Sequence, residues 1–150
     1  MKNKKSGDIL SFIGNIIQEK TQVEGDSIYL TVSKIFKLTT KGEIDFAGSE
    51  YKESEREIIE PVKRSSEDKY GWWELNLGEY FIEFNEKLQD IIPKDKTVVL
   101  QPSERLIGNG AFHPTRVLNK RGKISTILCV GKNGLKIKEN ARVSRLFVLD

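Results

Sequence analysis

The chain has 150 residues, of which 37% are hydrophobic and 31% charged, and its formal net charge is +3. These values predict one globular domain over residues 1–150, and the nearly balanced charge does not favour a nucleic-acid-binding protein. No apolar stretch approaches the roughly 20 residues that span a membrane. The single cysteine, Cys129, excludes an internal disulfide and favours a reducing, cytoplasmic setting.

Residues 8–19 are predicted to form one N-terminal helix, with Ser6 or Asp8 as its cap. Its apolar residues recur at helical spacing and form one face; they are Ile9, Phe12, Ile13, Ile16 and Ile17. Strand signals dominate from there on. Residues 27–38 carry β-branched and aromatic side chains in rough alternation, which predicts a long strand.

The middle of the chain is predicted to combine an exposed loop with a hairpin. Residues 47–70 are polar and indicate a solvated loop, with one short strand near residues 58–62. Residues 72–75 are a predicted strand, and residues 80–84 are expected to pair back on it after a turn. Neighbouring side chains on a strand face opposite sides, so we expect one of the two adjacent tryptophans to be core and the other exposed.

The C-terminal part is predicted to consist of strands separated by turns. Lys132-Asn133-Gly134 is expected to form a hairpin turn, because Asn-Gly readily adopts positive φ angles, and Asn140 marks a further turn. Strands are predicted over residues 97–100, 122–130, 135–137 and 141–149. Together these patterns predict a mainly β protein, a distorted jelly roll in the form of a barrel or sandwich, with one N-terminal helix.

Residues 101–110 (QPSERLIGNG) are the best candidate for a ligand-binding segment. Pro102 leads into a loop with a hydroxyl at Ser103 and a guanidinium at Arg105, and Gly110 closes the segment. Such a loop can present donors to an anion such as a nucleotide phosphate. The alternative is that the same residues form an ordinary turn and strand end.

Three stretches resemble motifs of the dUTPase and dCTP deaminase superfamily. Residues 75–81 (LNLGEYF) resemble the turn L-x-P-G-E-F, residues 102–110 resemble the phosphate loop R-S-S-x-A-x-x-x-G, and residues 140–146 (NARVSRL) resemble the strand G-x-R-I-A-Q-L. The resemblance implies a distorted jelly roll, a homotrimer with deoxynucleotide sites between subunits, and Mg²⁺ bound with the nucleotide. It implies either dUTP pyrophosphatase or dCTP deaminase chemistry.

The residues that would perform this chemistry differ from the family pattern. Asn119 stands where the dUTPases place the Asp that anchors the attacking water, and Ile127 stands at the catalytic Glu of the deaminases. Tyr29 replaces an early supporting carboxylate, and Arg145 replaces the Gln of the late motif. An amide can orient water but cannot accept its proton. No catalytic residue is therefore assigned.

The residues that could still bind a nucleotide or phosphate are Ser103, Arg105, Gly110, Asn119 and Arg145. The sequence thus favours a nucleotide-binding homologue with a degenerate catalytic site. The alternatives are an active, diverged dUTP or dNTP pyrophosphatase that requires Mg²⁺, and a structural or protein-interaction module. No metal site of the protein's own, no nucleic acid and no membrane contact are expected.

Other side chains are interpreted as structural. Arg142 is expected to be an ion-pairing residue, Cys129 a small core residue, and the only histidine, His113, a hydrogen-bonding residue on a surface loop. The acidic residues near position 55 are interspersed with basic ones, which favours a solvated loop over a metal site. The basic cluster at residues 120–123 has a solvated turn as its default interpretation.

Overall fold

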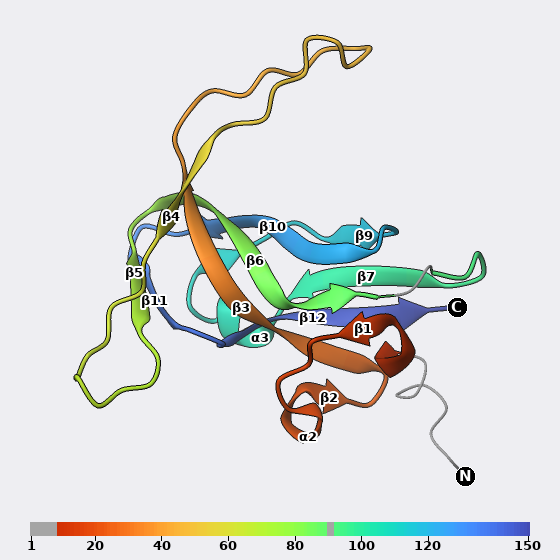
Figure 1. The fold of residues 1–150 in the computed structure, drawn as a ribbon, viewed down its shortest axis with the longest axis horizontal. Helices are drawn as coiled ribbons and strands as arrows, with labels where there is room; N and C mark the ends of the chain where they lie inside the picture. The colour runs from red at the N-terminus through yellow and green to blue at the C-terminus, as the bar shows by residue number, and fades with distance from the viewer. Residues whose placement is uncertain (1–8, 90–91) are drawn as a thin grey trace.

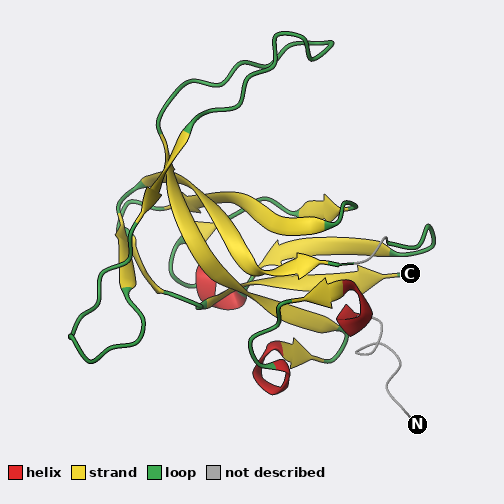
Figure 2. Ribbon diagram, viewed as in Figure 1, coloured by secondary structure: helices red, strands yellow, loops and turns green. Residues whose placement is uncertain are grey.

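The computed structural model describes residues 9–89 and 92–150, and it consists mainly of antiparallel strands with short helices (Figures 1 and 2). Within the described residues, ten strands form one strongly curled sheet, and two more form a small separate sheet. The predicted mainly β jelly-roll class is confirmed. The described residues contain no helix long and apolar enough to cross a membrane.

The main path of the large sheet runs β8-β10-β6-β3-β12-β7-β9, with β1 beside β6 and with β2 and β4 beside β3. The elements are β1 (Ile13–Gly14), α2 (Glu19–Gln22), β2 (Val23–Glu24), β3 (Ser27–Leu38), β4 (Arg56–Ile59), β5 (Trp72–Leu75), β6 (Gly78–Leu88), β7 (Thr97–Pro102), α3 (Glu104–Ile107), β8 (Ala111–Phe112), β9 (Arg116–Leu118), β10 (Gly122–Val130), β11 (Leu135–Lys138) and β12 (Arg142–Leu149).

The core lies inside the curl of the large sheet. Alternate residues of β6 and β10 point inward, and the buried set in β6 includes Ile82, Phe84 and Leu88. Strands β3 and β12 add Ile28, Leu30 and further aliphatic side chains to the same cluster. The sequence bounds of three strands, residues 27–38, 72–75 and 122–130, are confirmed because these segments have uninterrupted strand patterns.

The predicted N-terminal helix over residues 8–19 is wrong as one element. The structure has a helical turn at residues 9–12, then strand β1, and then the short helix α2. Asn15 has a φ angle of 63°, a left-handed conformation that ends a helix. Strand β1 instead pairs with the end of β6, through Ile13 and Leu88. The predicted caps, Ser6 and Asp8, lie outside the described residues.

Two predicted hairpins are also wrong in their pairing. Strand β6 does not fold back on β5; it lies between β3 and β10 in the large sheet. The turn at residues 132–134 exists, and Gly134 has a φ angle of 74°, but it connects β10 to β11, which belongs to the other sheet. Strand β11 pairs with β5, so Leu135 faces Leu75. Sequence periodicity identifies strands but does not identify their partners.

A long arm leaves the sheet between β3 and β4 and projects beyond the rest of the molecule (Figure 1). Its two sides are joined by reciprocal backbone hydrogen bonds between Glu43 and Lys52. Near its tip, the Asp45 carboxylate accepts hydrogen bonds from the backbone N–H groups of Gly48 and Glu50. The predicted exposure of residues 47–70 is confirmed for most of the segment.

One of the adjacent tryptophans is core as expected, whereas the other is not fully exposed and the cysteine is not core. Trp73 is buried at 2% exposure, and its indole N–H donates to the Ile59 carbonyl. Trp72 is half-buried, with the Arg64 guanidinium 3.6 Å from its ring centroid. Cys129 is half-buried rather than core, because on β10 it falls on the opposite face from the buried Leu128 and Val130.

Candidate functional site

Ser103 caps the short helix α3. Its Oγ accepts a hydrogen bond from the Leu106 N–H at 3.3 Å and donates to the Arg142 carbonyl at 3.5 Å. The side chain is only 1% exposed. Its backbone N–H donates to the Val143 carbonyl, which fixes the loop to β12. The hydroxyl is therefore turned toward the backbone and holds α3 in place.

Gly110 closes the same loop through its conformation. It has a φ angle of 75°, and its carbonyl accepts a hydrogen bond from the Gly131 N–H. A Cβ at Gly131 would lie 2.7 Å from that carbonyl oxygen, closer than side chains can approach. The two glycines thus allow the loop to pass close to the end of β10.

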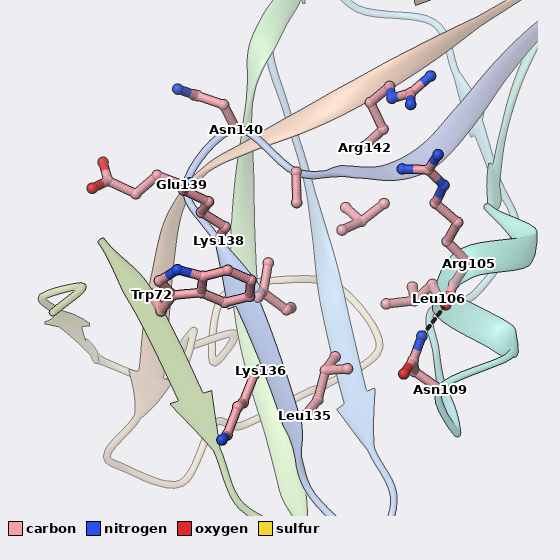
Figure 3. A pocket seen from close by; sticks show the side chains of 13 residues that line it. Trp72, Arg105, Leu106, Asn109, Leu135, Lys136, Lys138, Glu139, Asn140 and Arg142 are labelled. Carbon is pink, nitrogen blue, oxygen red and sulfur yellow. Dashed lines mark hydrogen bonds between the residues drawn. The ribbon is translucent and has the colours of Figure 1, made fainter. Parts of the chain in front are cut away.

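Arg105 points from α3 into a cavity of about 360 Å³ that opens between α3 and strands β11 and β12 (Figure 3). Trp72 forms the wall across from it, and Leu106 and Val143 belong to the apolar lining. Asn109 donates its side-chain N–H to the Arg105 carbonyl at 2.8 Å, which closes the last turn of α3. We call this cavity the Trp72 pocket.

Arg145 lies at a second cavity, of about 460 Å³, whose lining includes Gln101, Glu104 and Phe147. Its guanidinium donates to the Ser27 Oγ at 2.6 Å and lies 5.0 Å from each of the Tyr29 and Phe147 ring centroids. Arg145 and Tyr29 are direct cross-strand partners. Tyr29 on β3 and Arg145 on β12 both differ from the family motifs. They are therefore in contact with each other, and the contact pairs a cation with an aromatic ring.

Asn119 is exposed and lies at a third cavity, of about 560 Å³, next to the end of β9. Cations dominate its polar lining; they are Arg116, Lys120, Arg121 and Lys123. The predicted ligand residues are thus divided between separate parts of the chain. Ser103, Arg105 and Gly110 belong to one loop, and Arg145 lies on the neighbouring strand β12. Asn119 lines a separate cavity.

Arg142 is placed as the sequence predicts for a structural residue, although its partner is a carbonyl and not an acid. Its Nη1 donates to the Thr21 carbonyl at 3.2 Å, and its guanidinium lies 5.3 Å from the Tyr29 ring centroid. This contact connects β12 to the N-terminal segment of the same subunit.

His113 is not a surface residue, which corrects the sequence interpretation. It is 3% exposed, its Nδ1 donates to the Pro114 carbonyl, and its Nε2 accepts from the Ser144 hydroxyl at 2.7 Å. Burial lowers the pKa of the imidazole from its ordinary value. Both ring nitrogens form hydrogen bonds inside the protein, so this serine–histidine contact holds the 113–115 loop on β12. The buried imidazole is not accessible to a substrate.

Sequence reasoning missed a buried carboxylate, Glu86, at the centre of a polar cluster. Glu86 is fully buried and accepts hydrogen bonds from the Thr31 N–H and the Thr31 hydroxyl, both at 2.6 Å, and from Gln22 Nε2 at 3.3 Å. Asn85 donates to Thr31 Oγ1 and to Asn140 Oδ1. We call these five residues the Glu86 cluster.

The pKa of Glu86 is raised because burial outweighs the hydrogen bonds donated by Thr31 and Gln22, which favour its charged form. A signal was present in the sequence. In the alternation of β6, Glu86 falls on the same inward face as Phe84 and Leu88, where a carboxylate requires partners. The described residues contain no group of three or more His, Cys, Asp or Glu side chains that could hold a metal ion.

Comparisons with known proteins agree with this geometry. The chain is 31% identical over 135 residues to the probable deoxyuridine 5'-triphosphate nucleotidohydrolase of Methanosarcina mazei, which covers 88% of the chain and 74% of the relative. It is also 31% identical over 137 residues to the protein of the same name from Methanococcoides burtonii, covering 89% of the chain and 76% of that relative. No family model matches the chain.

Among solved structures, the 2'-deoxycytidine 5'-triphosphate deaminase of Agrobacterium tumefaciens superposes with a TM-score of 0.65 at 11% sequence identity. The match covers 95% of the chain and 46% of the deaminase chain. At this identity the likeness concerns the fold: the curled sheet described above is shared by the deaminase.

Proposed function

Since the chain belongs to the dUTPase and dCTP deaminase superfamily, we propose that it binds a deoxynucleotide at the loop 101–110 without hydrolysing it. The observation that carries this proposal is Asn119, an exposed amide at the position of the family's water-anchoring Asp. An amide donates and accepts hydrogen bonds but takes no proton at neutral pH. Binding is thus retained where general-base catalysis is lost.

The proposed binding groups come from two cavities. Arg145 and the loop 101–110 supply one part, and the cations around Asn119 supply the other. In this proposal the two parts meet between copies of the chain in a homotrimer, which is the assembly that the sequence motifs imply. Mg²⁺ would arrive with the triphosphate as part of the ligand, in a reducing cytoplasm.

Direct assays test this function. The purified protein is incubated with Mg²⁺ and dUTP, dCTP, dATP, dGTP or dTTP, while pyrophosphate and ammonia release and thermal stability are followed. We expect one deoxynucleotide to raise the melting temperature without turnover. Arg145→Gln should abolish that stabilisation. Turnover by the wild type at a rate typical of enzymes would contradict the proposal, and absence of both turnover and stabilisation would contradict nucleotide binding altogether.

A second variant addresses the missing base. Asn119→Asp restores the carboxylate, but the chain lacks the tyrosine that follows in the family motif, since Lys120 and Arg121 run directly into Gly122. We therefore expect Asn119→Asp alone to remain inactive toward dUTP. Robust hydrolysis by this single variant would show that only the base is missing.

Two other functions have their own support. An active dUTP or dNTP pyrophosphatase is favoured by the names of the curated relatives, and the turnover assay decides it. A protein-interaction module is favoured by the projecting arm, where Ile44 is 90% exposed and Phe46 is fully exposed. Loss of self-association or of a partner in Phe46→Ser, with nucleotide binding unchanged, would support the interaction function.

A further inference from the structure

The Trp72 pocket and the cavity that contains Arg145 have no lining residue in common. Neighbouring residues of helix α3 separate the two spaces, since Glu104 lines the Arg145 cavity and Arg105 lines the Trp72 pocket. Ser103 holds this helix against β12 through its hydrogen bonds to the Arg142 and Val143 carbonyls. A ligand in the Trp72 pocket would therefore contact a different set of side chains from one bound beside Arg145.

The charge of the pocket favours an anion. Four cations line it, Arg105, Lys136, Lys138 and Arg142, against one carboxylate, Glu139. That carboxylate is engaged locally, because its Oε1 accepts the Gly71 N–H at 2.8 Å. Lys136 pairs with the exposed Glu74, and Arg142 is held by the Thr21 carbonyl.

Arg105 is the cation best placed to receive an anion. It is exposed, and within residues 9–89 and 92–150 its guanidinium has neither a hydrogen bond nor an ion pair. Its backbone position is nevertheless fixed, because Asn109 and the Ser103 cap hold both ends of α3. A pre-positioned guanidinium without a partner is well suited to a phosphate, which it can bind through two parallel N–H donors.

The opposite wall favours a planar ring. Trp72 lines both the pocket and a smaller cavity, and Arg64, whose guanidinium lies 3.6 Å from the indole centroid, lines only the smaller one. In the pocket itself, the Lys138 ammonium lies 5.8 Å from the ring centroid. The apolar lining between Trp72 and Arg105 includes Leu106, Leu135 and Val143. Figure 3 shows the indole and the Arg105 guanidinium on facing sides of this space.

We propose that the Trp72 pocket is a second ligand site, specific for a nucleoside monophosphate, with the base against Trp72 and the phosphate at Arg105. Its volume of about 360 Å³ falls in the range of small-molecule sites. The base would replace water on an aromatic and aliphatic surface, while Arg105 neutralises the phosphate. This site is contained in one subunit and uses neither Arg145 nor Asn119.

Tryptophan fluorescence gives a direct readout, with AMP as the probe and dUMP, adenosine and ribose 5-phosphate as comparisons. Trp73 is buried and supplies a constant background, so saturable quenching by AMP should arise from Trp72. We expect adenosine and ribose 5-phosphate each to bind more weakly than AMP, since each lacks one half of the ligand. Trp72→Phe should abolish the quenching, while calorimetry reports the remaining affinity.

Arg105→Gln and Arg145→Gln form a matched pair of variants. Arg105→Gln should weaken AMP binding by roughly ten- to a hundredfold, as expected for loss of a charged hydrogen bond, while Arg145→Gln should leave it unchanged. The reverse pattern would place AMP in the Arg145 cavity and overturn the proposal. Equal losses in both variants, or no saturable binding of AMP to the folded wild type, would also overturn it.

A short thymidine oligonucleotide completes the test. If it binds more tightly than AMP in a Trp72-dependent manner, the ligand class is a nucleic-acid strand, and the mononucleotide proposal is wrong. The two proposals can fail separately. The deoxynucleotide function predicts that Arg145→Gln loses triphosphate binding and still binds AMP. The Trp72 pocket predicts that Arg105→Gln loses AMP binding.

Discussion

The Glu86 cluster and the Trp72 pocket both contain charged groups, but these groups lie in opposite environments. In the cluster, the carboxylate is fully buried, and the side chains around it donate hydrogen bonds to it or to one another. In the pocket, Arg105 and Lys138 are exposed, and neither has a carboxylate partner among residues 9–89 and 92–150. Asn140 contributes to both regions, since its side chain bonds Asn85 and its residue lines the pocket.

The Glu86 cluster therefore serves the stability of the fold, whereas the Trp72 pocket is suited to binding a ligand. The described residues have two buried side-chain polar atoms without a partner, Thr126 Oγ1 and Arg145 Nε, and neither belongs to the Glu86 cluster. A saturated cluster has no capacity left for a ligand, and its removal costs stability. An unsaturated cationic pocket contributes little to stability, and its removal should cost binding.

Glu86→Ala should cause the largest loss of stability. It removes the acceptor for the Thr31 N–H, the Thr31 hydroxyl and Gln22 Nε2, and it leaves a cavity between β3 and β6. We expect the free energy of unfolding to fall by about 3–5 kcal/mol. Urea denaturation followed by circular dichroism measures this; a loss below 1 kcal/mol would show that the cluster is not a stabilising unit.

Glu86→Gln is the control, and it also tests the role of charge. Because the pKa of Glu86 is raised above 4.5, the stability that its protonated form contributes is present below that pH and lost as the pH rises through the folded pKa. Glutamine is neutral throughout. The stability of the wild type relative to Glu86→Gln should therefore decrease from acidic to neutral pH, and an increase would contradict the raised pKa.

Ser103→Ala should have the next largest effect, because it removes the cap of α3. The Leu106 N–H loses its acceptor, and the helix that carries Arg105 loses its attachment to the Arg142 carbonyl. We expect a loss of about 1–2 kcal/mol, measured by thermal unfolding. Ser103→Thr retains a hydroxyl and should recover most of the loss. Failure to recover it would indicate that the Ser103 hydroxyl acts only on a ligand.

Substitution of His113 should have a smaller effect on stability, and this effect should depend on pH. Since burial lowers its pKa from 6.5, the stability of the neutral ring is present above that value and lost as the pH falls through the folded pKa. His113→Gln should be less stable than the wild type at pH 8, and the difference should shrink by about 1 kcal/mol per pH unit within that window. A difference independent of pH would contradict the buried neutral imidazole.

Arg105→Gln should change stability least, by less than about 0.5 kcal/mol, because its exposed guanidinium has no partner among the described residues. Lys138→Gln serves as a matched control in the same pocket. Thermal unfolding without ligand measures both. A large loss in Arg105→Gln would show that the pocket is part of the stabilising framework, as the Glu86 cluster is.

The strands could be predicted from the sequence where one face is buried. The alternation in residues 122–130 defines β10 at both ends, and residues 27–38 likewise define β3. The N-terminal helix could not, because Asn15 adopts a left-handed conformation and β1 finds a partner in β6 that lies more than 70 residues away. Such long-range pairing overrides local helical periodicity.

The binding role of the candidate site residues stays a prediction. The motifs identify the loop 101–110 and the family, but they do not show that the Ser103 hydroxyl is turned inward or that His113 is buried. The Trp72 pocket has a signal only in retrospect: residues 135–138 alternate apolar and lysine side chains, so both lysines lie on one face of β11. Which element lies opposite that face depends on the topology.

The pairing of β3 with β12 has a consequence for synthesis of the protein. The long strand near the start of the chain lies next to the strand that ends at Leu149, so the centre of the sheet joins residues separated by more than 100 positions. Among the described strands, β12 is the neighbour of β3 on that side, so during translation this side stays open until residues 142–149 have left the ribosome. The large sheet should therefore be completed only after β12 has been synthesised, and β3 is the segment that requires protection from aggregation until then.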